Sequence, residues 1–259
     1  MYNNLFSIGK FTIHSYGLMI ALGGLCAYFV SDYRAKKRGL DADRMFSIVI
    51  RALFGGFAGA KILYYVTILD QIIRDPSLLL DISNGFVVYG GILGGILASF
   101  LYCRRTGTSF ITYADLLMPE VALAQAFGRI GCLLAGCCYG LPTDSPFSIT
   151  FQHSDIAPNG IALIPTQPIS SALDFLNFLA LLFLARRAKK PGTVTACYLT
   201  FYSLGRFVLE FFRGDLIRGS VGVLSTSQLI ALFVFAGGCI LLLAAGKRTS
   251  AAPSDSAGA

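Results

Sequence analysis

An arginine, three cysteines and four glycines lie within the otherwise apolar segment 128–140, GRIGCLLAGCCYG. A guanidinium group stays charged at every physiological pH, so Arg129 among leucines and isoleucines is costly unless it faces a polar cavity, an anion or a carboxylate. A structural ion pair within a helix bundle is the alternative. Ionisable residues at membrane depth more often mark functional sites. We therefore expect chemistry at this segment.

The composition around the segment is that of a membrane protein. The chain has 259 residues, of which 55% are hydrophobic and 14% are charged, whereas soluble domains carry roughly 25% charged residues. The mean hydropathy is +0.67, and too few polar residues remain to cover a soluble core. The net charge of +7 comes from short basic clusters between apolar runs, so it does not indicate nucleic-acid binding.

Seven apolar runs predict an all-α integral membrane protein with about seven transmembrane helices and a small extracytoplasmic cap. The runs occupy residues 11–30, 45–69, 86–102, 110–134, 172–185, 194–212 and 228–245. We expect one transmembrane domain over 1–248, in which residues 141–168 form the cap and contain a short strand near 147–151. The first run has full span length and is expected to be retained. The end, 249–259, is expected to be a disordered cytoplasmic tail.

Basic residues predict the orientation of the helices, because short cytoplasmic loops are enriched in lysine and arginine. Clusters such as 34–38 and 186–190 fall in alternate loops on one side of the predicted bundle. The amino terminus and the cap are therefore expected outside, and the carboxyl terminus in the cytoplasm.

The seven cysteines lie inside or at the ends of apolar runs, which argues against a disulfide scaffold of exposed loops. Cys132, Cys137 and Cys138 form a Cys-x4-Cys-Cys pattern near Arg129. Inert packing is one interpretation. Zinc prefers four N or S ligands and adjacent cysteines rarely chelate one ion alone, so we predict no metal and no cofactor. A redox or covalent role is better motivated, because the charge of Arg129 favours a thiolate.

A second polar group lies in the sixth run. Arg206 and Glu210 are four residues apart, so they share a helix face and can form an ion pair; a salt bridge that merely keeps the helix insertable is the alternative. Arg129 and Arg206 both lie toward the outer side and can together bind a phosphate in bidentate fashion. Tyr16 and Tyr89 can hydrogen-bond phosphate or glycerol oxygens, although tyrosines near span ends are also common anchors.

In order and spacing, these motifs resemble the prolipoprotein diacylglyceryl transferase family over most of the chain. The resemblance rests on YGLM at 16–19, GG at 90–91, GRIG at 128–131, Gly136, YG at 139–140, PTQ at 165–167, RF at 206–207, EFFR at 210–213, LS at 224–225 and Gln228. It implies a bacterial inner-membrane enzyme that moves diacylglycerol from phosphatidylglycerol to the lipobox cysteine of a prolipoprotein signal peptide, releasing glycerol phosphate. It also implies functional importance for Tyr16, Arg129, Gly140 and Arg206.

Two departures from the family pattern bear on the chemistry. Tyr89 stands where the family has a histidine before the paired glycines, and a phenol is a poorer general base at neutral pH than an imidazole. Cys132 and Cys137 stand where family members usually carry asparagine and an acidic residue. We hypothesise that Cys132 or Cys137 lines the cavity and either replaces the missing base or receives an acyl, glyceryl or sulfur group.

The predicted mechanism assigns a role to each group. The catalytic residues are Arg129, Arg206, Tyr89, Tyr16, Glu210, Cys132, Cys137 and Cys138, and the substrate-binding residues are Gly90, Gly91, Gly140, Gln167, Arg213 and Gln228. The phospholipid enters sideways between helices, and the two arginines hold its phosphate. The acceptor thiolate attacks the glyceryl carbon while the arginines stabilise the leaving group. The tyrosines orient the glycerol, and Glu210 positions Arg206.

Two alternatives stay open at this point. The same fold and phosphate site can serve an enzyme that uses its own three clustered thiols on a different lipid or thiol substrate. A non-enzymatic anion-binding transporter also fits the glycine-interrupted runs and buried arginines, although no internal repeat is evident.

Overall fold

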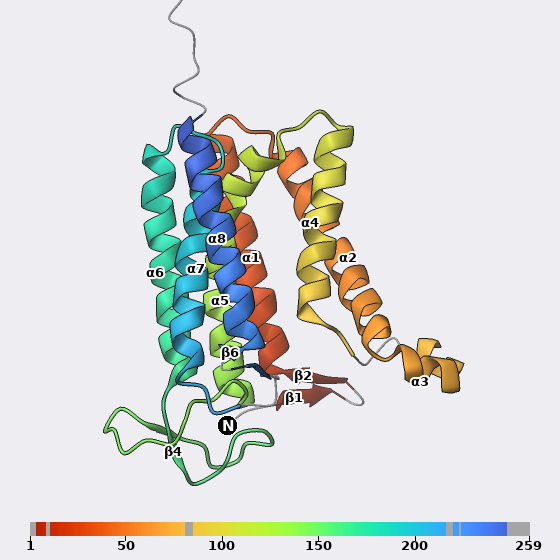
Figure 1. Cartoon of the computed structure of the whole chain (residues 1–259), viewed down its shortest axis with the longest axis vertical. Coiled ribbons are helices and arrows are strands. Elements are labelled where there is room, and N and C mark those ends of the chain that lie inside the picture. Colours follow the sequence, from red (N-terminus) through yellow and green to blue (C-terminus); the bar gives the residue numbers. More distant parts are fainter. Residues whose placement is uncertain (1–3, 9–10, 81–84, 216–219, 223, 248–259) are drawn as a thin grey trace, which may run out of the picture. The chain divides into compact units, whose positions relative to one another are not determined.

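The computed structural model describes residues 4–8, 11–80, 85–215, 220–222 and 224–247, so the predicted tail over 249–259 lies outside the described residues. Most of the described residues are helical (Figure 1). Within this part of the chain, seven helices have 18 to 26 residues: α1 (Ser15–Lys37), α2 (Ala42–Thr67), α4 (Val88–Arg105), α5 (Phe110–Ala135), α6 (Thr166–Arg187), α7 (Thr193–Glu210) and α8 (Thr226–Lys247).

Five of these helices, α1, α2, α5, α6 and α8, are long and apolar enough to cross a membrane, judged over the described residues. The prediction of a helical membrane protein is therefore confirmed. The count of seven spans stays a prediction. Helix α4 ends in Arg104 and Arg105, and α7 carries Arg206 and Glu210, so these charged residues lower the mean hydropathy of both helices.

Shorter elements precede or connect the long helices. They are α3 (Leu69–Arg74), the 3-10 helix η1 (Pro76–Leu80), and the strands β1 (Asn4–Ile8), β2 (Phe11–His14), β3 (Ile149–Thr150), β4 (Ala162–Leu163), β5 (Ser220–Val221) and β6 (Leu224–Ser225). The strands pair in sequence as three antiparallel two-stranded sheets.

Two predicted helix starts are wrong. The first run was expected to be helical from residue 11, but residues 11–14 form β2, which pairs with β1, and α1 begins at Ser15. The fifth helix begins at Thr166 and not at 172. Pro168 made this segment resemble a loop, yet proline is tolerated in the first helical turn, where its missing N–H has no intrahelical acceptor.

The chain divides into two compact units. Unit 1 comprises Met1–Ser31 and Ala114–Ala259, and unit 2 comprises Asp32–Tyr113. The single domain expected over 1–248 stays a prediction.

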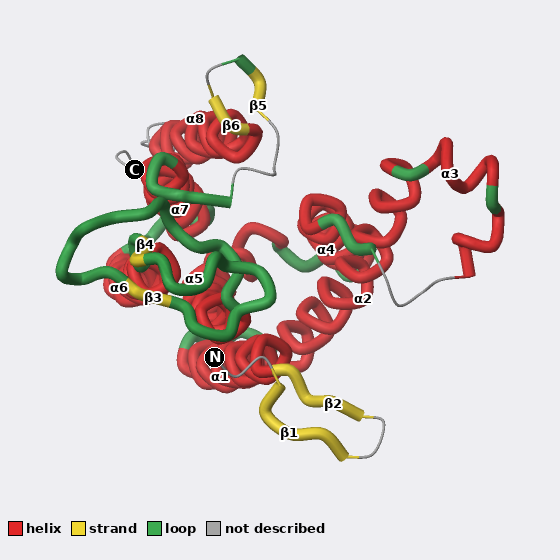
Figure 2. The backbone as a smooth tube through the Cα atoms, turned by 90° about the horizontal axis from the view of Figure 1, so that it is seen from below, coloured by secondary structure: helices red, strands yellow, loops and turns green. Residues whose placement is uncertain are grey.

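In unit 1, helices α5, α6 and α7 share an apolar core, and Figure 2 shows these helices beside α1 and α8. The core contains Ala122, Leu123, Phe178, Leu181, Ala185, Val194 and Tyr198. A buried carboxylate also joins α5 to the start of α7. Asp115 accepts hydrogen bonds from the backbone N–H groups of Gly192 (2.6 Å) and Thr195 (2.7 Å). It thereby satisfies donors that a helix start leaves without an intrahelical partner.

The segment between α5 and α6 folds over the end of α5. Strand β3 pairs with β4 through Ile149–Leu163 and Thr150–Ala162, so the strand predicted within 147–151 is present in part. Phe151, Ala157 and Leu163 of this segment form a small core, with Leu133 and Tyr139 packed against it. That this segment is an extracytoplasmic cap stays a prediction.

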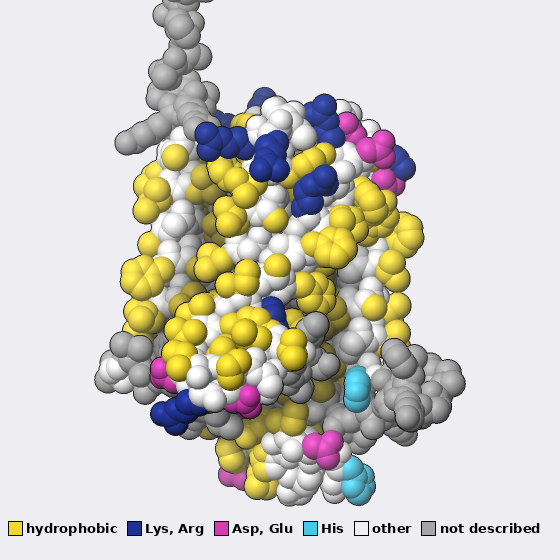
Figure 3. Space-filling model, turned by 90° about the vertical axis from the view of Figure 1, so that its right-hand side faces the viewer, with side chains coloured by type: hydrophobic (Ala, Val, Ile, Leu, Met, Phe, Trp, Pro, Cys, Tyr) yellow, Lys and Arg dark blue, Asp and Glu magenta, His cyan; other side chains and the backbone are white. Residues whose placement is uncertain are grey.

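In unit 2, glycines allow α2 and α4 to pack at very short range. A Cβ atom on Gly59 would collide with the carbonyl oxygen of Gly90, and one on Gly94 would collide with that of Gly55. Large apolar side chains such as Phe54 and Leu93 remain exposed. In Figure 3, hydrophobic side chains cover these helices along their length, while lysines and arginines gather toward one end. Such a surface is typical of helices that face lipid.

Candidate active site

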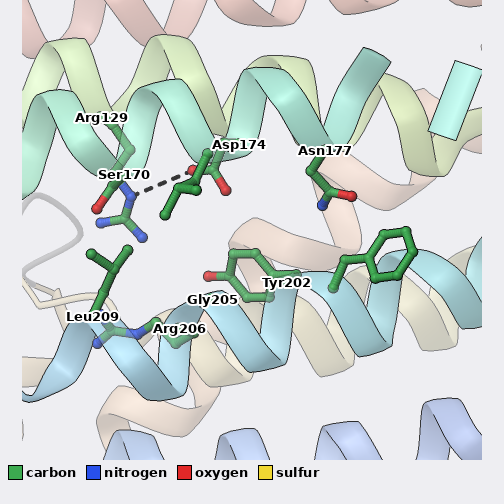
Figure 4. Close-up of a pocket in the computed structure, with 10 residues that line it drawn as sticks. Arg129, Ser170, Asp174, Asn177, Tyr202, Gly205, Arg206 and Leu209 are labelled. Carbon is green, nitrogen blue, oxygen red and sulfur yellow. Dashed lines mark ion pairs between the residues drawn. The ribbon is translucent and has the colours of Figure 1, made fainter. Parts of the chain in front are cut away.

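Both arginines singled out in the sequence line one pocket of unit 1 (Figure 4). Arg129 comes from α5 and Arg206 from α7, and the pocket has a volume of about 40 Å³. Further residues of α6 and α7 complete the lining. The structure thus brings together two guanidinium groups from separate helices, although their catalytic roles stay predictions.

Each arginine has a carboxylate neighbour. Nη2 of Arg206 lies 2.8 Å from Oε2 of Glu210 and donates a hydrogen bond of 3.1 Å to Oγ of Ser227, so the predicted Arg206–Glu210 pair is confirmed. Nε of Arg129 lies 3.8 Å from Oδ2 of Asp174. This distance is too long for a good hydrogen bond. Arg129 therefore keeps donors that can turn toward an anion.

Three polar residues of α6 line the pocket and were not among the predicted site residues. Ser170, Asp174 and Asn177 are spaced by four and three residues, which places them on one helix face. The same spacing is visible in the sequence, but the predicted helix start at 172 left Ser170 outside the helix. The amide nitrogen and oxygen of Asn177 are buried, and within the described part of the chain they have no hydrogen-bond partner.

An apolar groove of about 720 Å³ adjoins the polar pocket, and the two share Leu173, Phe201, Gly205 and Leu209. Its remaining lining comes from α6, α7, the turn after α7 and the segment between α5 and α6: Thr143, Ser145, Phe147, Ile164, Pro165, Thr166, Ile169, Leu204, Val208 and Phe212. A cationic pocket that opens into an apolar groove matches a molecule with an anionic head and apolar chains.

The end of α5 brings the three cysteines of segment 128–140 together. The N–H groups of Gly136 and Cys137 donate to the carbonyls of Leu133 and Cys132, and Gly136 has φ +71°. This is a Schellman motif, which favours glycine at that position. Cys138 also has a positive φ, +61°, which is uncommon for a residue other than glycine. As a result, the three Sγ atoms lie within 4.8 Å of one another.

Two buried side chains at the start of α6 hold the backbone of the cysteine pair. Oγ1 of Thr166 donates to the carbonyl of Cys138, and Nε2 of Gln167 donates to the carbonyl of Cys137, both at 2.9 Å. Gln167 was expected to bind substrate. Its side chain is 2% exposed, and this contact supports a role in positioning the cysteines.

The electrostatics of the cluster oppose one sequence-based expectation. Hydrogen bonds with the thiols of Cys132 and Cys138 raise the pKa of the Cys137 thiol above its usual value, and burial raises it further. A thiol with a raised pKa is protonated at neutral pH. The thiolate that Arg129 was expected to favour is therefore disfavoured at Cys137.

Tyr16 lies next to the same cluster. A Cβ atom on Gly131 would lie 3.1 Å from Cδ2 of Tyr16, so the glycine leaves room for the ring. The Tyr16 phenol interacts electrostatically with Arg129 and with all three thiols. The structure therefore groups Tyr16, Arg129 and the cysteines as predicted candidates, while their roles stay predictions.

Backbone pairing joins Gly140 to Arg213. The N–H of Leu141 donates to the carbonyl of Phe212, and the N–H of Gly214 donates to the carbonyl of Tyr139, both at 3.0 Å. A side chain at Gly140 would collide with the carbonyl of Ile164, which explains the glycine.

Arg213 and Gln228 were predicted to bind substrate, and both are engaged within the protein. Arg213 donates to both carboxylate oxygens of Asp215, at 2.8 and 2.6 Å. Gln228 accepts from the N–H of Ser225 (2.9 Å), while Oγ of Ser225 accepts from the N–H of Gln228 (3.1 Å). This reciprocal pair is a capping box at the start of α8. A direct contact of either residue with substrate stays a prediction.

Tyr89, Gly90 and Gly91 lie in unit 2, in the first turn of α4. The two glycines pack against Gly59 and Gly56 of α2, and the Tyr89 side chain is 41% exposed. The close helix approach accounts for the glycines. A role of these three residues in binding substrate stays a prediction.

Comparison with known proteins agrees with this picture. A model of the family described as prolipoprotein diacylglyceryl transferase matches residues 3–244. The chain is 48% identical over 229 residues to phosphatidylglycerol–prolipoprotein diacylglyceryl transferase of Clostridium tetani, covering 88% of this chain and 92% of that protein. It is 46% identical over 230 residues to phosphatidylglycerol–prolipoprotein diacylglyceryl transferase 2 of Clostridium perfringens, covering 88% of this chain and 90% of that protein. It is 31% identical over 245 residues to the Finegoldia magna protein with that name, covering 94% and 95%.

Proposed function

The chain belongs to the prolipoprotein diacylglyceryl transferase family, and we propose that it transfers a diacylglyceryl group from phosphatidylglycerol to the cysteine thiol of a prolipoprotein. The bond between the glyceryl carbon and the phosphate oxygen breaks, a carbon–sulfur bond forms, and glycerol phosphate and the thiol proton are released. The observation that carries the proposal is the pocket with Arg129 and Arg206 at the edge of an apolar groove.

The two arginines suit the charge that develops in this reaction. The phosphate gains negative charge as its bond to the glyceryl carbon breaks, and donors that are already aimed at it lower the barrier without reorganisation. Glu210 and Ser227 hold Arg206 in place. Arg129 has only the long contact with Asp174 as its ion pair within the described residues, so its guanidinium donors remain available to the phosphate.

The groove suits the rest of the lipid. A polar pocket of about 40 Å³ has no space for acyl chains, whereas the adjoining groove of about 720 Å³ is lined mostly by leucine, isoleucine, valine and phenylalanine. The chains can therefore remain in apolar surroundings while the headgroup reaches the arginines. The relatives' names favour this activity over a transporter or a different thiol substrate.

The proposed setting is a bacterial inner membrane crossed several times, with the amino terminus outside and the carboxyl terminus in the cytoplasm. The prolipoprotein signal peptide is the proposed protein partner. Basic residues in the last turns of α1 and α4 support a cytoplasmic position for those helix ends.

Arginine substitutions test the proposal directly. Membranes that contain the protein are incubated with phosphatidylglycerol vesicles and a lipobox peptide, and the diacylglyceryl mass shift of the peptide is measured. Arg129→Ala and Arg206→Ala should each lower the rate by roughly 10² to 10³, the range for losing a donor to a developing oxyanion. Arg51→Ala is the control, because Arg51 is exposed and lies over the Tyr102 ring in unit 2. Product formation at the wild-type rate in both site variants would exclude the proposed phosphate site.

A further inference from the structure

We propose that Cys132, Cys137 and Cys138 bind one zinc ion, and that the open fourth position of this ion takes the acceptor thiol. The second part rests on the proposed function, whereas the metal site rests on the geometry of the thiols alone. The inference replaces the sequence-based prediction of no metal, which rested on the preference of zinc for four ligands and on the rarity of adjacent cysteines that chelate one ion alone.

The positions of the sulfur atoms fit a tetrahedral zinc ion. Zinc–sulfur bonds of about 2.3 Å in tetrahedral geometry place the sulfur atoms about 3.8 Å apart. The three Sγ atoms already lie within 4.8 Å of one another, so small side-chain rotations suffice. Neighbouring side chains in an extended backbone point to opposite faces. The left-handed conformation of Cys138 (φ +61°) removes that obstacle.

The three ligands are held by separate supports. Cys132 lies in the last turn of α5, and the Schellman motif fixes the turn that follows. The carbonyls of Cys137 and Cys138 accept the hydrogen bonds of Gln167 and Thr166. Ligands that are fixed before the metal arrives lose little entropy on binding it.

The charge of the surroundings also fits. Three thiolates and Zn²⁺ carry a net charge of −1, and a fourth thiolate makes it −2. The guanidinium group of Arg129 interacts electrostatically with Cys132 and Cys138. The guanidinium group of Arg213 interacts with Cys138 and also pairs with Asp215. These cations offset the negative charge of the cluster in partly apolar surroundings.

A zinc ion at this site would activate the acceptor thiol, a role for which the predicted catalytic residues include no good general base. A site with three protein ligands and an open position is the arrangement found in catalytic zinc sites, and a coordinating thiol is deprotonated outright. The acceptor thiol releases its proton to water when it binds, and its sulfur attacks the glyceryl carbon as the bond to the phosphate oxygen breaks. The neutral thioether is a poor ligand and leaves. No oxidant or reductant is needed, and the general base at Tyr89 becomes unnecessary.

Metal content and cobalt spectra test the site on the full-length protein purified in detergent. The wild-type protein should hold one zinc ion per chain. Cys132→Ser, Cys137→Ser and Cys138→Ser should each weaken zinc binding at least about tenfold, whereas Cys239→Ser on α8 should bind as the wild type does. In the Co²⁺-loaded protein, a lipobox peptide should strengthen the thiolate-to-cobalt absorption, and the same peptide with serine in place of cysteine should not.

A variant that fails to fold would also lose zinc, so the wild-type protein is alkylated as well. In wild-type protein first stripped of metal with a chelator, added Zn²⁺ should slow the alkylation of Cys132, Cys137 and Cys138, as read by mass spectrometry of the peptides. The metal site is refuted if the wild-type protein binds neither Zn²⁺ nor Co²⁺, or if alkylation proceeds at one rate with and without Zn²⁺. A cobalt spectrum that the lipobox peptide leaves unchanged refutes the acceptor position.

The outcomes separate this inference from the proposed function. If the wild-type protein forms diacylglyceryl peptide but binds no metal, the zinc site is wrong and the transferase function stands. If the protein binds zinc through the three cysteines but modifies no lipobox peptide, the metal site stands, and both the proposed function and the acceptor position are wrong.

Discussion

At the scale of single residues, Asn177 contributes to the pocket an amide whose buried atoms find no hydrogen-bond partner among the described residues. Leaving such a group unsatisfied costs about 1–3 kcal/mol. A bound headgroup resolves this cost, because the amide can both donate and accept. Arg206, by contrast, is already held by Glu210 and Ser227. Asn177 is therefore the pocket residue whose hydrogen bonds we expect substrate to complete.

Asn177→Ala should lower kcat/KM for phosphatidylglycerol about tenfold, which corresponds to about 1.4 kcal/mol and to one hydrogen bond. Its melting temperature should stay level or rise, because the variant loses an unsatisfied amide. Asn159→Ala is the matched control. That amide accepts from the N–H of Ser154 and donates to its carbonyl, so this variant should lose stability and keep its activity. Unchanged kinetics in Asn177→Ala, measured by the peptide mass shift, would contradict the assignment.

At the scale of elements, glycine decides how closely α2 and α4 approach. Gly59 faces the backbone of Gly90 at a distance that admits no Cβ atom, whereas a Cβ atom on Gly56 would lie 3.4 Å from the nearest carbonyl oxygen, that of Gly91. Small residues at such crossings allow tight packing between membrane helices. The two glycines occupy the same helix but differ in what surrounds them.

Gly59→Ala should destabilise the protein by about 1–3 kcal/mol, because the added methyl group must push the two backbones apart. Gly56→Ala in the same helix should be close to neutral or slightly stabilising, since alanine is the better helix former by about 1 kcal/mol. Thermal unfolding in detergent compares the two variants. Equal melting temperatures would mean that the helices do not cross at Gly59 as described.

At the scale of the whole molecule, the charged ends of the helices predict how the chain is oriented in the membrane. Arg34, Lys36 and Lys37 lie in the last turn of α1, and Arg104 and Arg105 lie in the last turn of α4. Basic residues are enriched on the cytoplasmic side. The segment between α5 and α6, which carries Phe147 (83% exposed), is therefore expected on the opposite side.

Cysteine labelling in intact cells tests this orientation. Phe147→Cys should react with a membrane-impermeant maleimide added outside, because the residue is exposed and is expected outside. Lys37→Cys, exposed at the end of α1, should react only after the cells are permeabilised. Label incorporation is read by mass spectrometry, with the wild-type chain as the background from its own cysteines. The opposite pattern would invert the predicted topology.

Local sequence patterns predicted the contacts that lie within one element. Arg206 and Glu210 pair because four residues make one turn of α7. Contacts that depend on a loop were not predictable in this way. Arg213 pairs with Asp215 two residues away, beyond the end of α7, and no periodicity indicates that contact. The polar face of α6 was missed because Pro168 made the first turn of the helix resemble a loop, so the helix was predicted to begin at 172.

The sequence by itself determined the apolar helices, their approximate places and the resemblance to one family, because hydropathy, charge clusters and motif spacing are properties of consecutive residues. Only the tertiary structure decided which side chains from different elements meet. Arg129, Asp174 and Arg206 come from three helices and share a pocket through packing. The thiols of segment 128–140 converge because one glycine and Cys138 adopt left-handed conformations, which residue spacing alone does not specify.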